Sequence, residues 1–426
     1  RRMSLTEEMT DLAKRARLAS RRLASLSADD KNGCLVAMAE SIEANAERIQ
    51  GENAKDMDAG AEAGLAKPML DRLLLDETRI EGMANGLRQV AALADPVGRI
   101  IEERTRPNGL KLSKVASPIG VIVIIYESRP NVTADAASLC FKSGNATILR
   151  GGKEALHSNQ AIAKIMVEAA ARSLPAFPAG AIQVVPTPDR AAIPELLSLT
   201  GEVDLCIPRG GESLIRAVAE CSQVPVIKHY KGVCHVYIDG AAELAMAEEV
   251  AFNSKVHRPG VCNAAETLLI DRGVAAEALP RLAKRLAEAG VALRGDEPTR
   301  SLLHDSGIEV TPASEADWGK EYLDLVLSVK VVEGVGGAIE HINTHGSGHT
   351  ETIVTGDELA AKRFQVEVDS STIFWNASTR FTDGGEFGMG AEIGISTDKI
   401  GARGPMGLEE LTSYKWLGVA DGLIRQ

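Results

Sequence analysis

The sequence constrains the fold most through a repeated alternation of short apolar segments with longer amphipathic ones, which begins at residue 120. Residues 120–126 (GVIVIIY) are apolar on both faces, a pattern typical of a parallel strand buried within a sheet. Strands that alternate with helices form parallel sheets with right-handed crossovers, so the pattern predicts a doubly wound α/β domain. We expect its strands at 120–126, 146–149, 182–185 and 203–207, and its helices at 132–142, 158–172, 191–199 and 212–220.

A second alternation of the same kind begins near residue 228 and predicts a second α/β domain. We expect its strands at 233–238, 265–270, 325–331 and 352–355, and its helices at 242–252, 275–289, 337–343 and 358–366.

The two ends of the chain have different patterns from the centre. Apolar spacings of three and four residues predict helices at 5–26, 28–45 and 68–94, with no strong strand before residue 110. Residues 104–115 are typical of a hairpin that turns at Pro107-Asn108-Gly109. The glycine-rich tail from residue 369 has no convincing long helix, and we expect it to pack back on the rest of the chain.

Composition narrows the class of ligand. The 426 residues are 45% hydrophobic and 25% charged, ordinary values for a globular protein of two or three domains. A net charge of −12 with 4% aromatic residues argues against a nucleic-acid or membrane partner and favours a small molecule. Six cysteines without a CxxC pair, and no recognisable secretion signal, lead us to expect reduced thiols and a cytoplasmic location.

The segment 256–266 (VHRPGVCNAAE) contains the strongest candidate for a nucleophile, Cys262. A thiolate is the reactive form of cysteine, and neighbouring cations such as His257 and Arg258 favour it. The alternative interpretation is that Cys262 is a small buried hydrophobic residue, as free cysteines often are.

Glycines and cations follow two predicted strands of the first domain and suit an anionic ligand, such as the adenosine side of a dinucleotide. The first segment is 149–155 (LRGGKEA), and the second, 208–213 (PRGGES), opens a helix whose free N–H groups favour phosphate. No GxGxxG motif is present, so a solvated glycine loop remains the alternative. The residues we assign to the cofactor here are Arg150, Gly151, Gly152, Lys153, Gly210 and Gly211.

Histidines spaced by four could gather imidazoles for zinc if one helix carried His341, His345 and His349. Gly346 and Gly348 should end that helix before His349, so we expect no metal site. Instead we assign His349 and Thr350, together with Arg258, to the phosphate or the carboxylate of an anionic substrate.

Two further segments supply polar side chains for a substrate. Asn376 and Arg380, in 374–380 (FWNASTR), follow a strand. Arginine suits a carboxylate or phosphate because its guanidinium can donate two parallel hydrogen bonds. Ser128 and Asn131 follow the first strong strand, at the carboxyl edge where ligands of such sheets bind.

Several of these segments together resemble the aldehyde dehydrogenase superfamily and, within it, the family of γ-glutamyl phosphate reductases, over nearly the whole chain. The most specific is 332–353 (VEGVGGAIEHINTHGSGHTETI); YESRPNVTADAA, GNATILRGGKEA, HRPGVCNA and FGMGAEIGIST are also similar to this family. The resemblance implies that Cys262 is the catalytic cysteine and that Glu321 contacts the nicotinamide ribose.

The chain also departs from the general superfamily pattern. Ser128 stands where an asparagine helps to stabilise the oxyanion, and Arg150 and Lys153 replace the lysine and glutamate that touch the adenosine ribose. Cations there predict a preference for NADP over NAD, because they can meet the 2′-phosphate. His229 stands where other members have the glutamate that activates water.

The resemblance implies an NADPH-dependent reduction of L-glutamyl 5-phosphate to L-glutamate 5-semialdehyde through a thioester on Cys262, in proline biosynthesis. The Cys262 N–H, with Ser128 or Asn131, would stabilise the oxyanion. Three parts are implied: a cofactor domain (1–103 and 116–228), a catalytic domain (229–367), and a bridging element that contributes to oligomerisation and to the substrate site (104–115 and 368–426).

The resemblance also implies a cytoplasmic homodimer or tetramer, with transient contact to glutamate 5-kinase. Two alternatives have the same fold: an ordinary NAD(P)-dependent aldehyde dehydrogenase, and a small-molecule binding protein without catalysis. A metal-dependent dehydrogenase that resembles histidinol dehydrogenase is a third.

Overall fold

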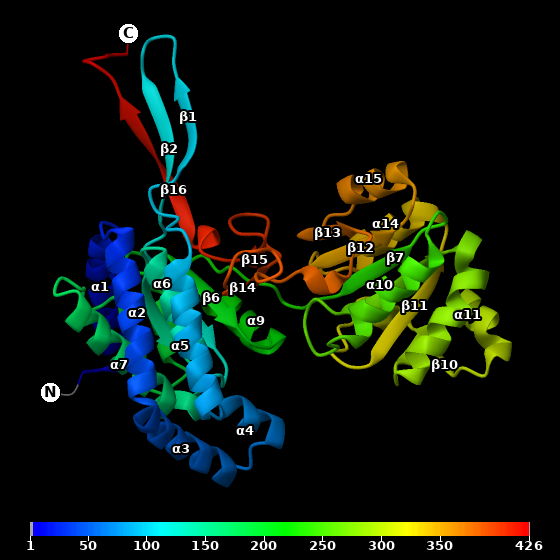
Figure 1. The fold of residues 1–426 in the computed structure, drawn as a ribbon, viewed down its shortest axis with the longest axis horizontal. Helices are drawn as coiled ribbons and strands as arrows, with labels where there is room; N and C mark the ends of the chain where they lie inside the picture. The colour runs from blue at the N-terminus through cyan, green and yellow to red at the C-terminus, as the bar shows by residue number, and fades with distance from the viewer. Residues whose placement is uncertain (1–2, 426) are drawn as a thin grey trace. The chain divides into compact units, whose positions relative to one another are not determined.

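The computed structural model describes residues 3–425. The chain folds into two compact units, each built on its own parallel sheet (Figure 1). Unit 1 comprises the chain up to Lys228, together with Gly388–Gly394 and the segment from Met406 onward. Unit 2 comprises His229–Phe387 and Ile395–Pro405. Among the described residues, no helix combines the length and the apolar character needed to cross a bilayer.

The sheet of unit 1 has the strand order β5-β4-β3-β6, and every neighbouring pair is parallel. All six residues of the central strand β3 are buried, which explains why this segment is apolar at both faces. This confirms the predicted doubly wound domain. The strands are β3 (Val121–Tyr126), β4 (Ala146–Arg150), β5 (Ile182–Val184) and β6 (Leu205–Arg209), and the helices are α6 (Asn131–Lys142), α7 (Leu156–Ser173), α8 (Ala192–Leu197) and α9 (Glu212–Cys221).

The strand register brings three loops of unit 1 to one edge. Ile125 pairs with Arg150, and Tyr126 pairs with Arg209, so the loops after β3, β4 and β6 begin side by side. The buried carboxylate of Asp56 fixes the loop after β4 by accepting hydrogen bonds from Ser158 N at 2.8 Å and Ser158 Oγ at 2.6 Å. Asp56 thus caps the start of α7 from a distant helix.

Five helices precede this sheet, where the sequence predicted three. The extra helix, at 46–62, contains two glycines, which weakened its helical pattern. The predicted helix 68–94 is two helices, because the chain is extended at Asp76, whose side chain then accepts from Arg79 N at 2.9 Å and caps the second. The five are α1 (Leu5–Leu23), α2 (Ala28–Ala44), α3 (Ala46–Glu62), α4 (Lys67–Leu73) and α5 (Glu77–Ala92).

An antiparallel arm completes unit 1 and extends away from its helices (Figure 1). It has the order β1-β2-β16, from β1 (Ile100–Thr105), β2 (Lys111–Pro118) and β16 (Thr412–Val419). The expectation of no strong strand before residue 110 was therefore wrong. Because β1 is exposed along nearly its whole length, its sequence IIEERT lacks the alternation of apolar and polar residues that reveals a strand packed on a core.

Unit 2 contains a seven-stranded sheet in the order β10-β9-β11-β8-β7-β12-β13, with every neighbouring pair parallel. The second predicted α/β domain is thus confirmed. Its strands are β7 (Cys234–Ile238), β8 (Ala265–Asp271), β9 (Ala292–Gly295), β10 (Val310–Pro312), β11 (Val326–Val332), β12 (Thr350–Val354) and β13 (Thr372–Trp375). Its helices are α10 (Leu244–Val256), α11 (Arg272–Glu288), α12 (Glu297–Leu303), α13 (Glu315–Trp318), α14 (Gly334–His345) and α15 (Glu358–Glu367).

Four of the elements that the sequence did not predict in unit 2 lie between α11 and β11. These are β9, β10, α12 and α13, of three to seven residues each, too short to develop a recognisable period. The short elements elsewhere are η1 (Lys153–Ala155), η2 (His304–Ser306), η3 (Thr379–Phe381), β14 (Gly394–Ser396), β15 (Gly404–Met406) and η4 (Glu409–Leu411).

Candidate active site

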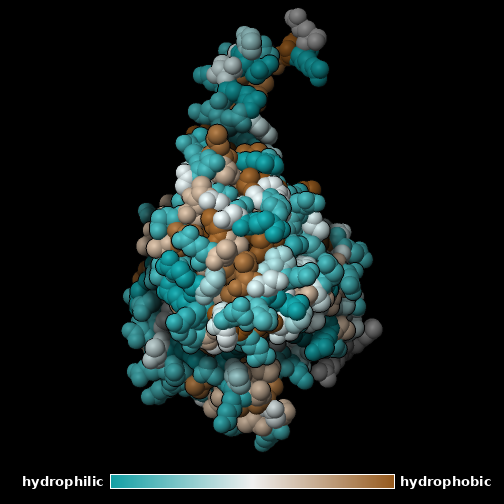
Figure 2. Space-filling view, turned by 90° about the vertical axis from the view of Figure 1, so that its right-hand side faces the viewer, coloured by the Kyte–Doolittle hydropathy of each residue, from teal (hydrophilic) through white to brown (hydrophobic). Residues whose placement is uncertain are grey.

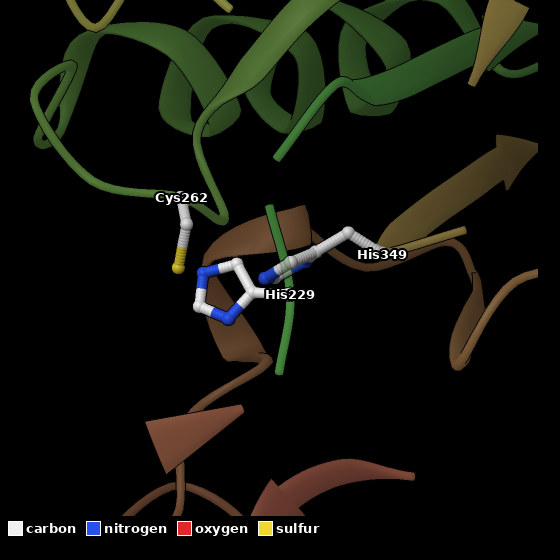
Figure 3. A group of neighbouring side chains, drawn as sticks. All are labelled: His229, Cys262 and His349. Carbon is white, nitrogen blue, oxygen red and sulfur yellow. The ribbon is translucent and has the colours of Figure 1, made fainter. Parts of the chain in front are cut away.

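Three side chains with catalytic potential converge at the amino-terminal edge of the sheet of unit 2. The register pairs Cys234 of β7 with Ala265 of β8, and His235 of β7 with Glu351 of β12. The segments that enter these three strands therefore lie side by side, and they carry His229, Cys262 and His349 (Figure 3). One nitrogen or sulfur atom from each lies within 4.8 Å of the other two.

The backbone of Cys262 is held by the strand-entry segment beside it. A Cβ atom on Gly232 would lie only 1.9 Å from the Cys262 carbonyl oxygen, so the close approach requires glycine. The Gly232 N–H donates to Glu321 Oε1 at 2.8 Å, and the Cys234 thiol donates to the Cys262 carbonyl at 3.2 Å. Glu321, predicted to contact the nicotinamide ribose, thus also positions the chain next to Cys262.

Cys262 differs from the other thiols in its surroundings. Four cysteines are buried, and burial raises the pKa of Cys34 to about 11 and that of Cys140 to about 12. Burial likewise raises the pKa of Cys206, of Cys234 and of the partly exposed Cys221. Cys262 is partly exposed, and its Sγ points toward the imidazole of His229 (Figure 3).

The proton on His229 is assigned by its hydrogen bond. Nδ1 lies 2.8 Å from the carbonyl oxygen of Ile395, and because a carbonyl can only accept, Nδ1 must carry the proton. Nε2 is then the unprotonated nitrogen, and it is the one turned toward Cys262 in Figure 3. An imidazole nitrogen in this state can accept the proton of a neighbouring thiol.

His349 is buried and offers a lone pair rather than a charge. Its ring centroid lies 5.5 Å from that of His229. Its Nδ1 lies 2.8 Å from Thr350 Oγ1, whose hydroxyl donates to Thr382 Oγ1 at 2.9 Å, so Nδ1 is the donor toward Thr350. Burial, and then the nearby His229, lower the pKa of His349 to about 3. His349 is therefore neutral near pH 7, and the Thr350 hydroxyl is already committed, which argues against charge-assisted anion binding by this pair.

The three regularly spaced histidines do not come together. Helix α14 ends at His345, as the following glycines predicted. The rings of His341 and His345 lie 4.6 Å apart, and burial is the main cause that lowers the pKa of His341 to about 2. His349, beyond the helix, joins Cys262 instead.

Two arginines provide positive charge near Cys262. Arg380 is held where its guanidinium donates to Asn263 Oδ1, and Nε donates to His257 Nδ1 at 3.4 Å. Burial and then the charge of Arg258 lower the pKa of Arg380, whereas Cys262 acts to raise it. Arg258 and Arg380 are thus close enough to each other, and Arg380 to the thiol, to attract an anionic substrate group.

Asn376 is used to support the backbone. It adopts a left-handed conformation with φ of 58°. Its Oδ1 accepts from Thr355 N at 2.9 Å, and its Nδ2 donates to Thr355 O at 3.1 Å. Both ends of the amide are therefore engaged by the backbone of Thr355, so the structure gives no support to a substrate-binding role for Asn376.

Unit 1 has a separate pocket of about 710 Å³ at the carboxyl ends of β3 and β4. Predicted residues Ser128, Arg150, Gly152 and Lys153 line it. A Cβ on Gly152 would lie 2.9 Å from Ser128 Oγ, so glycine keeps this wall open. The cations along the pocket are Arg72, Arg129, Arg150, Lys153 and Arg190, against the two acids Glu127 and Glu154.

The cations of this pocket have different roles. Arg150 is buried and donates to the carbonyls of Gly151 at 2.8 Å and Pro188 at 2.9 Å, so it braces the loop. Lys153 and Arg190 are exposed, so they are better placed than Arg150 to bind a phosphate. Arg190 and Arg72 were not predicted from the sequence, because they come from distant loops and helices and belong to no recognisable motif.

The remaining predicted residues of unit 1 have partners within that unit. Ser128 Oγ donates to Glu154 at 2.9 Å, and Asn131 Nδ2 donates to Asp135 at 3.2 Å. At the start of α9, beside Gly210, the N–H of Gly211 donates to Glu127 at 3.2 Å. The oxyanion and cofactor roles of these residues stay predictions.

Comparison with known proteins agrees with the architecture. The aldehyde dehydrogenase family model matches residues 3–301. The chain belongs to the aldehyde dehydrogenase family. Among its curated relatives, the γ-glutamyl phosphate reductase of Geobacter metallireducens is 52% identical over 424 residues, with all of both chains covered. That of Paramagnetospirillum magneticum is 51% identical over 417 residues, covering 98% of this chain and 97% of the relative.

One solved structure has nearly the same fold as this chain. The crystal structure of the γ-glutamyl phosphate reductase from Thermotoga maritima matches with a TM-score of 0.95 at 42% identity. The match covers 98% of this chain and all of that one. The predicted two-domain α/β fold is thereby confirmed.

The arrangement of His229 and Cys262 predicts that His229→Asn slows alkylation of Cys262 by iodoacetamide at neutral pH by roughly tenfold, because the thiol loses its proton acceptor. Peptide mass spectrometry after timed labelling measures the rate at each cysteine. His304→Asn, at an exposed histidine, is the control and should leave the rate unchanged. An unchanged rate in His229→Asn would contradict the assigned role of Nε2.

Proposed function

We propose that the chain reduces L-glutamyl 5-phosphate to L-glutamate 5-semialdehyde and phosphate, with NADPH as the reductant, in proline biosynthesis. The observation that carries the proposal is the Cys262 thiol facing the unprotonated nitrogen of His229, with Arg380 and Arg258 nearby. Relatives at 51–52% identity over essentially full length are named for this reaction.

The residues around Cys262 can perform the acyl transfer. His229 Nε2 accepts the thiol proton, and the thiolate attacks the acyl carbon of the substrate. The carbon–oxygen bond to phosphate breaks, and His229 returns the proton to the departing phosphate, which Arg258 and Arg380 attract. When bound, NADPH supplies the hydride that reduces the resulting acyl group on Cys262. The tetrahedral adduct on Cys262 then collapses and releases the aldehyde, and the thiolate that remains takes up a proton from solvent to restore the starting state.

The replacement of the water-activating glutamate by His229 disfavours the ordinary aldehyde dehydrogenase as an alternative. A carboxylate in that place would activate water against the thioester, and the acyl group would be hydrolysed. The single proton on His229 is held at Nδ1 by Ile395, and its lone pair points toward sulfur. We infer that this arrangement leaves the thioester to react with phosphate or hydride.

The pocket of unit 1 fits the phosphorylated side of NADP. Lys153 and Arg190 are exposed on its rim and can bind a 2′-phosphate, while Arg150 supports the loop between them. Its volume of about 710 Å³ is in the usual range for a cofactor-sized ligand.

We also propose that the protein is a homo-oligomer that pairs through the arm of unit 1. Within residues 3–425, β16 pairs only with β2, so its other edge has unpaired backbone groups. Figure 2 shows apolar side chains among the polar ones of this arm, and the exposed ones on β16 are Tyr414, Trp416, Leu417 and Val419. The oligomer size, and contact with glutamate 5-kinase, stay predictions.

All six cysteines are free thiols. Free thiols persist in a reducing compartment, so we propose the cytoplasm as the site of the reaction.

The proposed reaction predicts that, run backwards with pyrroline-5-carboxylate and NADP, steady formation of NADPH requires inorganic phosphate. Absorbance at the nicotinamide band measures the rate. Cys262→Ser should abolish turnover, because the thioester cannot form, while Cys34→Ala, at a buried thiol that lines neither the pocket nor the site around Cys262, should retain it. Steady turnover at the same rate without phosphate would support the ordinary dehydrogenase instead.

The charge of the pocket predicts that Lys153→Ala combined with Arg190→Ala weakens NADPH binding at least about a hundredfold and NADH binding little, because each charged hydrogen bond contributes about 1.5–3 kcal/mol. Fluorescence titration gives both dissociation constants. Lys164→Ala, at an exposed lysine outside the pocket, is the matched control. Equal losses for both nucleotides would mean that these cations do not bind the 2′-phosphate.

A further inference from the structure

We propose that His229, Cys262 and His349 form a binding site for a zinc ion, and that zinc bound there reversibly blocks the nucleophile. The inference goes beyond the proposed function, because it depends on the side chains alone and not on the reaction they perform. It concerns a different set of ligands from the histidines of α14.

The ligand set is one that zinc prefers. Zinc binds thiolate sulfur and imidazole nitrogen in tetrahedral sites, and three protein ligands with one open position are common. His229, Cys262 and His349 supply two nitrogens and one sulfur, from three segments that the sheet register holds together. The fourth position would be taken by water.

Both imidazoles have the form that a metal requires. In most metal sites each histidine donates its second N–H to a carbonyl or another acceptor, which fixes the ring and exposes the opposite lone pair. His229 Nδ1 donates to Ile395 O at 2.8 Å, and His349 Nδ1 donates to Thr350 Oγ1 at 2.8 Å. Neither Nε2 therefore needs to lose a proton before it binds a metal.

A second observation points to a ligand at this place. His349 is completely buried, and its Nε2 has no hydrogen-bond partner among residues 3–425. A buried polar atom without a hydrogen-bond partner is unfavourable. In Figure 3 this nitrogen points toward His229 and Cys262, so a metal bound by those two would also satisfy it.

The spacing needs only a small contraction. The three ligand atoms already lie within 4.8 Å of one another. Zinc bonds of about 2.3 Å to sulfur and about 2.0–2.1 Å to nitrogen place neighbouring ligand atoms about 3.3–3.6 Å apart. Side-chain movements of about 1 Å therefore suffice, within the reach of the partly exposed Cys262 and His229.

Binding at this site would switch off the thiol. Zinc displaces the Cys262 proton into solvent and bonds to the sulfur, whose lone pairs are then not available to attack a carbonyl or an alkylating agent. The bound zinc also occupies the His229 lone pair that accepts the thiol proton. Removal of the metal by a chelator restores both groups.

The test uses the purified full-length protein, with Zn²⁺ or Co²⁺ chloride as the probe. We expect about one Zn²⁺ per chain, near-complete loss of Cys262 alkylation by iodoacetamide, and recovery with EDTA. Co²⁺ should produce the intense near-ultraviolet absorption of a thiolate-to-cobalt transition. These readouts do not require turnover, so the proposal and the proposed function can fail separately.

Variants identify the ligands. Cys262→Ser should abolish the cobalt–thiolate absorption, and His349→Gln should weaken Zn²⁺ binding at least about a hundredfold, because loss of an outer-sphere partner alone costs 10–100-fold. Cys221→Ser and His304→Asn, outside the site, should bind like the parent. Circular dichroism checks that His349→Gln is folded. Loss of the absorption in Cys221→Ser, or full alkylation of Cys262 in saturating Zn²⁺, would overturn the proposal.

Discussion

The hydrogen bond from His229 Nδ1 to the carbonyl of Ile395 determines the chemistry of the whole site. A carbonyl accepts and never donates, so this bond keeps the proton on Nδ1 and leaves Nε2 as a base facing Cys262. Proton transfer from the thiol and the binding of a soft metal both depend on that lone pair. Without the bond, Nε2 could carry the proton, and neither process would have an acceptor.

The register of three parallel strands places this base beside its thiol. Ligands of open α/β sheets usually bind at the carboxyl ends of the strands, and the pocket of unit 1 follows that rule. The group around Cys262 instead lies where β7, β8 and β12 begin. Gly232 allows this arrangement, because the Cβ atom of any larger residue would lie only 1.9 Å from the carbonyl oxygen of Cys262.

The sequence predicted both parallel sheets, because buried strands such as β3 are apolar throughout and the helices between them are periodic. It also made Cys262 a candidate nucleophile, from the glycine and cations around it and from the resemblance to a known family. It could not predict that His349 is neutral, since its low pKa comes from burial by residues far away in the chain. The role of Asn376 and the presence of Arg190 in the pocket likewise depend on tertiary contacts that no local motif encodes.

In the proposed reaction, Cys262 carries the acyl group. That role is tested most directly by mixing the enzyme with pyrroline-5-carboxylate and NADP while phosphate is absent, then measuring NADPH and digesting the protein for mass spectrometry. We predict a burst of about one NADPH per chain, followed by near-arrest, with a glutamyl group on the peptide that contains Cys262. Continuous NADPH formation with an unmodified Cys262, or acylation of another residue, would contradict the account.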